Sequence, residues 1–353
     1  MPVFPDFRRG VYNIPHTVLN ILGIQESQSL ENYRDLREDK LILILIDALG
    51  MNLFEKYHLE DMWSEYTVLT SLFPSTTANV LTTLYTGLKP IDHGILEFRM
   101  YYEEYGGVIK TLPFTTEESR ENDLLLKMGY SPNKLFALPT IFQRLREEGM
   151  RSAALIRGEY ADASYTRFLI NGAEIVPYRD LHEAFLLLRK RNEDFVYLYL
   201  DYLDTTEHLY GVHSPETREV LMEIVEEVEK LRKSCDAMII IAADHGQVDM
   251  EKIEVIPWNC PYPPGGSPRD LFIYSCAPPE NMGTVLEKSE LLQSGILGEG
   301  AGHPSIEKRV PDYILLPPDS CGVWNRRFRA CGLHGGLSEE EMLVPFVVLC
   351  EKS

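Results

Sequence analysis

The amino-acid sequence predicts an α/β fold, with a doubly wound, mostly parallel central sheet flanked by helices and a small cap insertion. Several apolar runs are continuous rather than alternating, which is typical of strands buried on both faces of a sheet. Amphipathic segments of helical periodicity lie between these runs, as in proteins that alternate strands and helices. The 353 residues are 44% hydrophobic and 25% charged, a globular composition. We therefore expect residues 1–353 to form a single large α/β domain.

The expected strands are the apolar runs themselves. They cover residues 41–46 (LILILI), 195–200 (FVYLYL), 238–243 (MIIIAA), 271–274 (LFIY) and 343–349 (LVPFVVL). Each run is far too short to cross a bilayer, so we expect no membrane-spanning segment and no membrane partner.

The expected helices are the amphipathic segments between the runs. Residues 139–149 and 180–192 have this pattern, and the first ends at Gly149, a typical C-cap. Ser214 is a typical N-cap and precedes a helix over residues 215–234, which repeats apolar residues at helical spacing.

Two stretches interrupt the alternation of strands and helices. Residues 98–137 are rich in Tyr, Gly and Glu, and residues 251–320 contain PWNCPYPPGGSPRD followed by short mixed elements. We interpret both as insertions that form a cap over one edge of the sheet. Their residues would determine substrate specificity.

The charge balance limits the kinds of partner. Lys and Arg number 34 against 54 Asp and Glu, a formal net charge of −20. Bulk attraction to a phosphate backbone is therefore not expected, and neither is a nucleic-acid polymer as partner. A small anionic substrate would need cations placed locally, such as bound metal ions.

The cysteines and the N-terminal residues predict a cytoplasmic protein. The cysteines include no C-x-x-C pair, and their number in a chain of 353 residues does not suggest a disulfide framework, so we expect reduced thiols. The first residues, MPVFPDFRRGVYNIPH, lack the apolar core of a signal peptide.

Carboxylates and imidazoles follow the predicted strands or lie just before the last one. They are Asp47, Asp204, His208, Asp244, His245 and His334. In open α/β sheets, residues beyond the carboxyl ends of the strands meet at one edge. Three Asp and three His form two sets of three ligands, which suit two divalent metal ions, with zinc expected and manganese as the alternative.

Each of these residues also has an ordinary structural explanation. Asp47 is placed as a helix N-cap, and Asp204 and His208 have the i, i+4 spacing of a helical surface pair. The D-H-G triplet is more specific, because Gly246 permits a tight turn behind two inward side chains. His334 is surrounded by glycines, which suggests a close approach to another group. The combination of all these residues favours a metal centre.

A candidate nucleophile lies in residues 73–87 (FPSTTANVLTTLYTG). A helix is expected to start directly after Thr77, so its hydroxyl would lie where the helix dipole and free N–H groups attract phosphate. A hydroxyl beside metal ions is an activated nucleophile. The alternative is simple N-capping by Ser75, Thr76 or Thr77.

The order of these motifs resembles the alkaline phosphatase superfamily, and within it the type I phosphodiesterase/nucleotide pyrophosphatase family. The resemblance extends from about residue 40 to 349. Its motifs are Asp47, F-P-x-x-T ending at Thr77, T-G-x-x-P-x-x-H-G at 86–94, D-x-x-x-H at 204–208, D-H-G at 244–246 and H-G at 334–335.

The resemblance implies an alkaline phosphatase-like fold and a role for each motif residue. It implies Thr77 as the nucleophile, bridging toward both metal ions. It assigns the ligands of one ion as Asp204, His208 and His334, and those of the other as Asp47, Asp244 and His245.

The phosphate contacts depart from the family pattern. The family often has Asn three residues after the nucleophile, whereas here that residue is Val80 and the nearest amide is Asn79. Either Asn79 or the backbone N–H of Ala78 would then hold a phosphate oxygen. Segments similar to uncharacterised prokaryotic members add Arg99 and Arg269 as candidate anion contacts, with an ordinary salt bridge as the alternative for each.

The residues and the resemblance together predict a two-metal-ion hydrolase. It would cleave phosphodiester or pyrophosphate bonds of a small phosphate ester or nucleotide-like substrate through a phospho-threonine intermediate. The alternatives are a phosphomonoesterase or phosphotransferase of the same superfamily, and an inactive binding protein. No Lys or Arg lies between residues 74 and 88, which favours a diester over a monoester. A sulfatase would need the motif C-x-P-x-R, which is absent.

Overall fold

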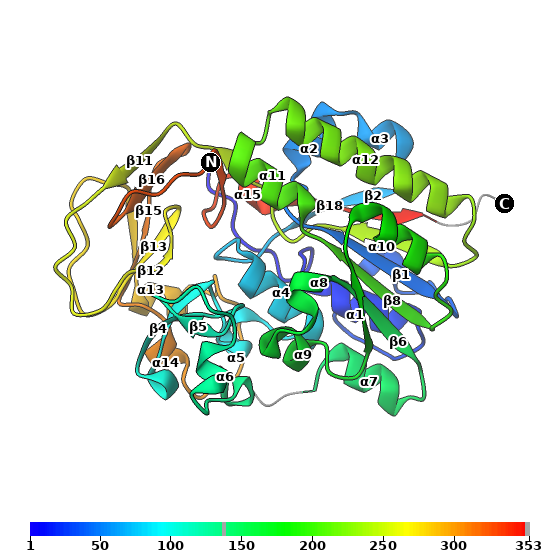
Figure 1. The fold of residues 1–353 in the computed structure, drawn as a ribbon, viewed down its shortest axis with the longest axis horizontal. Coiled ribbons are helices and arrows are strands. Elements are labelled where there is room, and N and C mark those ends of the chain that lie inside the picture. Colours follow the sequence, from blue (N-terminus) through cyan, green and yellow to red (C-terminus); the bar gives the residue numbers. More distant parts are fainter. Residues whose placement is uncertain (136–138, 350–353) are drawn as a thin grey trace.

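The computed structural model describes residues 1–135 and 139–349 and shows an α/β fold built on a seven-stranded sheet (Figure 1). Residues 136–137 of the first predicted insertion, and Cys350, lie outside the described residues. The strand order is β2-β18-β9-β1-β8-β6-β7. In that order the strands span Tyr66–Thr70, Leu343–Leu349, Met238–Ala242, Leu41–Ile46, Phe195–Leu200, Ser152–Arg157 and Glu174–Tyr178.

The sheet is mostly parallel, as predicted. The three central strands β9, β1 and β8 pair in parallel, and all their residues are buried. Strand β18 is the exception, because it runs antiparallel to both β9 and β2. The edge strands β2 and β7 mix exposed and buried residues, so their sequences lack the continuous apolar signal.

Helices cover both faces of the sheet (Figure 1). Helices α1, α4 and α7 pack on one another on one side, and α10 packs with α12 on the other. The helices of this part of the chain are α1 (Asn13–Ile21), α2 (Met51–Lys56), α3 (Leu59–Met62), α4 (Thr77–Thr86), α7 (Ile141–Glu147), α8 (Gly158–Ala161), α9 (Ser164–Leu169), α10 (Leu181–Leu188), α11 (Tyr202–Tyr210), α12 (Pro215–Arg232) and α15 (Glu339–Met342).

The helix boundaries follow from local capping. Ser214 caps α12 by accepting a hydrogen bond from the backbone N–H of Thr217 at 3.1 Å, as its position predicted. Thr140 and Gln143 form a capping box at the start of α7. Gly149 follows α7 with a φ of 81°, the left-handed conformation expected after a helix.

The two stretches that interrupt the alternation form small sheets beside the main one (Figure 1). The first contains a sheet in the order β3-β4-β5. The second contains a four-stranded sheet in the order β12-β13-β15-β14 and strand β11, which pairs in parallel with β16 just beyond the predicted insertion. Their strands are β3 (Arg99–Tyr102), β4 (Gly107–Lys110), β5 (Thr115–Thr116), β11 (Lys252–Val255), β12 (Gly265–Ser267), β13 (Asp270–Ile273), β14 (Thr284–Glu287), β15 (Tyr313–Leu316) and β16 (Cys321–Trp324).

The apolar run at residues 271–274 therefore does not belong to the central sheet. It forms most of β13, which pairs antiparallel with β12 and β15. Strand β13 is buried throughout, so its sequence has the same continuous apolarity as a central strand. Continuous apolarity reports burial and does not identify the sheet.

The two interrupting stretches pack against each other. The ring of Tyr101 lies 4.9 Å from that of Tyr262 and 5.6 Å from that of Tyr274, measured between centroids. The carbonyl oxygen of Arg99 lies so close to Gly265 that a side chain there would clash with it. Segments far apart in the sequence thus form one body next to the central sheet.

One expectation about the cysteines is wrong. Cys260 and Cys276 form a disulfide, with their Cα atoms 5.5 Å apart, whereas we expected reduced thiols throughout. The spacing of 16 residues carries no sequence signal, and the pair meets only because the loop before β12 folds back beside the end of β13. Within the described residues, the structure contains no helix that combines the length and apolarity needed to span a bilayer.

Candidate metal and nucleophile site

The predicted ligand residues meet at one edge of the central sheet. Asp47 directly follows β1, and Asp244 and His245 follow β9. Asp204 and His208 lie on α11, which begins just after β8, and His334 follows the short strand β17 (Gly332–Leu333). Adjacent parallel strands end at the same edge, which is why residues so distant in sequence lie together.

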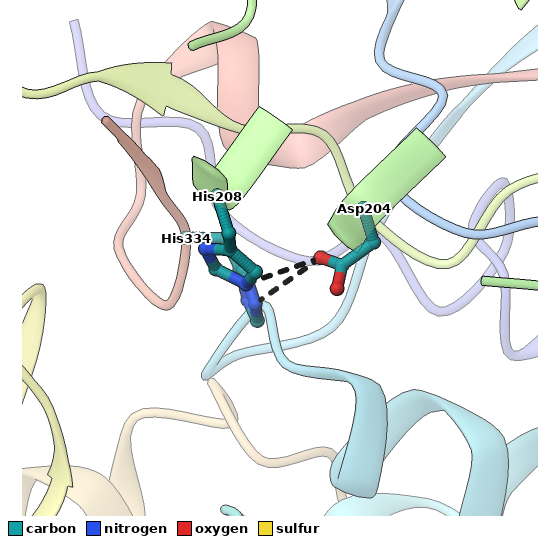
Figure 2. A group of neighbouring side chains, drawn as sticks. All are labelled: Asp204, His208 and His334. Atoms are coloured by element: carbon teal, nitrogen blue, oxygen red, sulfur yellow. Dashed lines mark ion pairs between the residues drawn. The ribbon is translucent and has the colours of Figure 1, made fainter. Parts of the chain in front are cut away.

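Asp204, His208 and His334 form the first group (Figure 2). Their ligand atoms all lie within 4.8 Å of one another. The Nε2 atoms of His208 and His334 lie 3.3 and 3.8 Å from Asp204 Oδ1. Their Nδ1 atoms lie 2.8 Å from the carbonyl of Gly332 and 2.9 Å from that of Ser75. A carbonyl can only accept, so each Nδ1 carries a proton, and Nε2 is the nitrogen that each ring turns toward Asp204 and a possible ligand.

The second group differs in membership from the predicted one. Its ligand atoms, also within 4.8 Å of one another, belong to Asp47, His245 and again Asp204. His245 Nε2 lies 3.6 Å from Asp47 Oδ1 and 3.3 Å from Asp244 Oδ2. One oxygen of Asp244, Oδ1, is already hydrogen-bonded. It accepts from the backbone N–H groups of Ala48 and His245 at 3.1 and 2.9 Å. The two predicted sets are thus adjacent rather than separate, and Asp204 reaches both.

The carboxylates of this site are buried close together. Burial, reinforced by Asp244 and Asp204, raises the pKa of Asp47 well above its ordinary value, and burial raises the pKa of Asp244 to about 6. Asp47 Oδ1 and Asp244 Oδ2 are buried without any hydrogen-bond partner in the described structure. The hydroxyl of Tyr199 donates to Asp47 Oδ2. Unpartnered buried carboxylate oxygens are costly, and a bound cation would satisfy them.

The histidines also suit metal binding. Burial lowers the pKa of His245 to about 4 and that of His334 to about 3, so both are neutral at pH 7. Burial acts the same way on His208, but Asp204 outweighs it and raises the pKa of His208 to about 9. Metal ligands must be deprotonated, so a metal ion would displace the Nε2 proton of His208 that Asp204 stabilises. The donor set of imidazole nitrogens and carboxylate oxygens fits zinc or manganese.

Thr77 is the first residue of α4 and faces these groups. Its Oγ1 lies 3.2 Å from His245 Nε2. The neighbouring hydroxyls are used elsewhere, because Thr76 donates to the carbonyl of Leu96 at 3.2 Å and Ser75 to that of Gly336 at 2.9 Å. The N-cap residue Thr76 makes no side-chain capping bond, so the capping alternative has no support at this position.

The structure separates the two candidates for holding a phosphate oxygen. Asn79 is fully buried, its Nδ2 donates to the carbonyl of Pro74 at 2.8 Å, and it does not line the cavity at Thr77. The expectation that its side chain contacts substrate is therefore wrong. Ala78 does line the cavity, and its N–H lies in the first helical turn, where backbone donors lack intrahelical partners.

Arg269 is not placed to bind a substrate. It is 2% exposed, and its Nε and Nη2 donate to Glu341 at 3.0 and 2.9 Å. Its Nη1 donates to the carbonyls of Pro318 and Cys321, both at 2.8 Å. Glu341 in turn accepts the N–H of Gly336 at 2.9 Å. Arg269 therefore supports the loop after His334 from behind, and the predicted anion contact is wrong.

Arg99 does line the cavity. Its Nε lies 3.2 Å from Glu117 Oε2, and its guanidinium lies over the rings of Phe98 and Trp324. Both the predicted anion contact and its salt-bridge alternative are compatible with this position.

A cavity of about 480 Å³ opens beside Thr77 and reaches the first ligand group. This volume is typical of small-molecule sites. Among its lining residues are Thr77, Asp204, His208, His334, Phe98 and Tyr160.

Close approach explains two glycines at the site. A Cβ on Gly246 would lie 2.1 Å from the carbonyl oxygen of Glu340, so the turn after His245 requires glycine. Gly335 has a φ of 126°, which other residues rarely adopt, and it follows His334 directly.

Gln247, which the sequence does not single out, contacts the predicted ligand Asp204. This buried residue donates from Nε2 to Asp204 Oδ1 at 2.6 Å and to the Asp204 carbonyl at 3.2 Å. Its position two residues after His245 was the only available signal, and one glutamine beside a motif does not reveal its partner.

The comparisons with known proteins agree with the fold. A model of the family described as type I phosphodiesterase / nucleotide pyrophosphatase matches residues 41–279. An inactive form of murine ectonucleotide pyrophosphatase / phosphodiesterase 5, in complex with AMP, has a TM-score of 0.68 at 16% identity, covering 89% of this chain and 88% of that one. Phosphonoacetate hydrolase from Sinorhizobium meliloti 1021, in complex with phosphonoacetate, has a TM-score of 0.64 at 17% identity, covering 88% and 90%. No curated protein matches the chain by sequence. At these identities, the two structures show that the fold is shared.

Proposed function

Because this chain belongs to the type I phosphodiesterase/nucleotide pyrophosphatase family, we propose that it is a two-metal-ion hydrolase that acts through a covalent phospho-threonine intermediate. It cleaves phosphodiester or pyrophosphate bonds of small phosphate-ester or nucleotide-like substrates. The observation that carries the proposal is the Thr77 hydroxyl, 3.2 Å from His245 at the edge of the ligand groups.

The same residues would hold the two ions. Asp204, His208 and His334 would hold one, and Asp47, Asp244 and His245 would hold the other, with Asp204 near both. Zinc is the expected metal and manganese the alternative. When bound, the ions supply positive charge to the phosphate and leaving-group oxygens and favour loss of the threonine proton.

The chain's own groups carry the rest of the reaction. Thr77 Oγ1 loses its proton and forms a bond to phosphorus as the bond to the leaving oxygen breaks. The leaving oxygen keeps the electron pair of that bond and takes up one proton in exchange for the one that Thr77 lost. Water then replaces the threonine oxygen, which regains a proton and leaves a phosphate monoester as the second product. The Ala78 N–H, at the start of α4, would stabilise a phosphate oxygen during both steps.

The test is a comparison of Thr77→Ala with Thr76→Ala. We expect Thr77→Ala to keep both metal ions and the fold while its turnover of bis(p-nitrophenyl) phosphate falls by several orders of magnitude, since covalent attack is lost. Thr77→Ser should retain part of the activity. Thr76→Ala is the matched control, because its hydroxyl is bonded to Leu96 instead, and we expect only a modest change.

Two results would contradict this mechanism. Loss of turnover in Thr76→Ala but not in Thr77→Ala would place the nucleophile one residue earlier. If neither variant lost activity while a chelator still stopped the reaction, water would attack phosphorus directly and no phospho-threonine would form.

A further inference from the structure

Among the residues that the structure describes, the cavity beside Thr77 has no unpaired Arg or Lys side chain in its lining. Among the described residues that line it, Arg99 is the only Arg or Lys. Its side chain is paired with Glu117 at 3.2 Å, and its backbone N–H donates to Glu97 Oε2 at 3.1 Å. Glu97 itself lines the cavity, and Glu117 also binds Arg326 at 2.7 Å. The one lining guanidinium is thus paired with Glu117, and a second carboxylate, Glu97, is held by the backbone of the same residue.

A second lining carboxylate, Asp201, is also ion-paired. Asp201 lines the cavity and is 4% exposed. It pairs with Arg157 at 2.9 Å, and Arg157 is also bound by Glu159 at 2.7 Å. Arg157 does not line the cavity, so it balances Asp201 from behind and presents no free charge to a ligand.

Much of the remaining lining is apolar. Phe98, Leu112, Pro113 and Phe328 are partly exposed around the cavity, and Tyr160 is 37% exposed. Apolar surface left open in a cavity gains free energy when a ligand covers it, at roughly 25 cal/mol per Å². An aromatic group can use this surface, whereas a charged group loses its hydration there without gaining a partner.

We propose that this cavity selects phosphodiesters with a single phosphate and an aromatic or otherwise apolar ester group over substrates with a second phosphate next to the scissile bond. This selectivity rests on the hydrolase function proposed above. A second phosphate adds at least one negative charge to a cavity whose described lining has no unpaired Arg or Lys, in a chain whose net charge is already −20. Of the two kinds of bond named above, phosphodiester and pyrophosphate, this chain would therefore prefer the phosphodiester.

The first experiment compares two substrates of the metal-loaded wild-type protein at pH 8. The phenyl ester of AMP and ATP share adenosine 5′-phosphate and differ only in the group beyond it. Phenolate is a poorer leaving group than pyrophosphate, so intrinsic reactivity favours ATP. We expect kcat/KM for AMP release to be at least about tenfold higher for the phenyl ester. An equal or higher value for ATP would overturn the proposal.

The second experiment removes the ion-pair partner of Arg99. Glu117→Gln removes the carboxylate between Arg99 and Arg326, and we expect the ratio of kcat/KM for ATP to that for the phenyl ester to rise about tenfold. Glu118→Gln is the matched control, because it removes the same charge from an exposed neighbour, and its ratio should stay within about twofold of wild type. An unchanged ratio in folded Glu117→Gln would contradict the role of charge pairing. If that variant does not fold, the wild-type comparison still decides the proposal.

The two proposals fail in different ways. If the protein binds metal but cleaves neither the phenyl ester nor bis(p-nitrophenyl) phosphate, the proposed function is wrong. If it cleaves both esters but prefers ATP, only the substrate selectivity is wrong.

Discussion

At the residue scale, three of the proposed ligands have one side-chain atom fixed by the backbone and a second atom that is not. His208 and His334 each hold Nδ1 against a backbone carbonyl, and Asp244 holds Oδ1 against two backbone N–H groups. The free atoms, Nε2 and Oδ2, then point to the shared space. Such outer contacts fix the orientation of a ligand before metal arrives.

Gln247 is the side chain that we expect to matter most for Asp204. Gln247→Leu removes the amide that holds Asp204 Oδ1 at 2.6 Å, and outer-shell losses of this kind weaken metal affinity about 10- to 100-fold. Titration against a chromophoric chelator measures this directly. Gln293→Leu, an exposed change on α13 (Lys288–Gln293), is the control and should leave the affinity at the wild-type value. Wild-type affinity in Gln247→Leu would show that the contact is incidental.

Arg269 should affect stability rather than substrate binding. Arg269→Ala leaves Glu341 as an unpaired buried carboxylate, and breaking such a pair costs about 3–5 kcal/mol. Chemical denaturation should show this loss. The double variant Arg269→Met/Glu341→Met removes both charges and should recover much of it. A folded Arg269→Ala of normal stability and raised KM would instead restore the predicted anion contact.

At the element scale, the loop before α4 and the loop after β17 hold each other. Ser75 Oγ donates to the Gly336 carbonyl at 2.9 Å and accepts the N–H of Gly335 at 3.1 Å. The Ser75 carbonyl accepts from His334. The helix that presents Thr77 and the loop that presents His334 are therefore one connected unit, which fixes the proposed nucleophile relative to a proposed metal ligand.

The disulfide should stabilise the body formed by the two interrupting stretches. Replacing both Cys260 and Cys276 with Ala opens a loop with a sequence separation of 16, and the loop-entropy relation gives a loss of about 3 kcal/mol. We expect a lower thermal midpoint, with the ligand groups on the central sheet retaining their metal. The checks are calorimetry and metal content. Loss of metal together with stability would mean that this body and the central sheet unfold as one unit.

At the scale of the whole molecule, metal binding should be linked to folding. The buried carboxylates Asp47, Asp204 and Asp244 repel one another in the apoprotein, and a ligand at 100 times its Kd adds about 2.7 kcal/mol per site. Chelator should therefore lower the thermal midpoint by several degrees, and zinc or manganese should restore it.

Elemental analysis of His334→Ala should show roughly one ion lost. Unchanged stoichiometry in that variant would remove His334 from the site.

Much of the fold and of the site was predictable from the sequence, because the relevant signals are local. Continuous apolar runs identified β1, β8, β9 and β18, since a strand buried on both faces admits no polar alternation. Asp and His directly after such runs identified the edge where they meet, and the i, i+4 spacing of Asp204 and His208 placed both on one helical turn. Thr77 could be singled out because Pro74 before it and the helical pattern from Ala78 onward predict that a helix starts there.

Only the tertiary structure decided how the remaining side chains are used. Arg269 and Glu341 are 72 residues apart, and their pairing is invisible until the chain folds. The same is true of Cys260 with Cys276 and of Gln247 with Asp204. It is also true of Arg99, the guanidinium that lines the cavity at Thr77, with Glu117. A sequence shows which groups can ionise or donate. Burial and distance set which partner each of them takes, and both arise only when distant segments pack together.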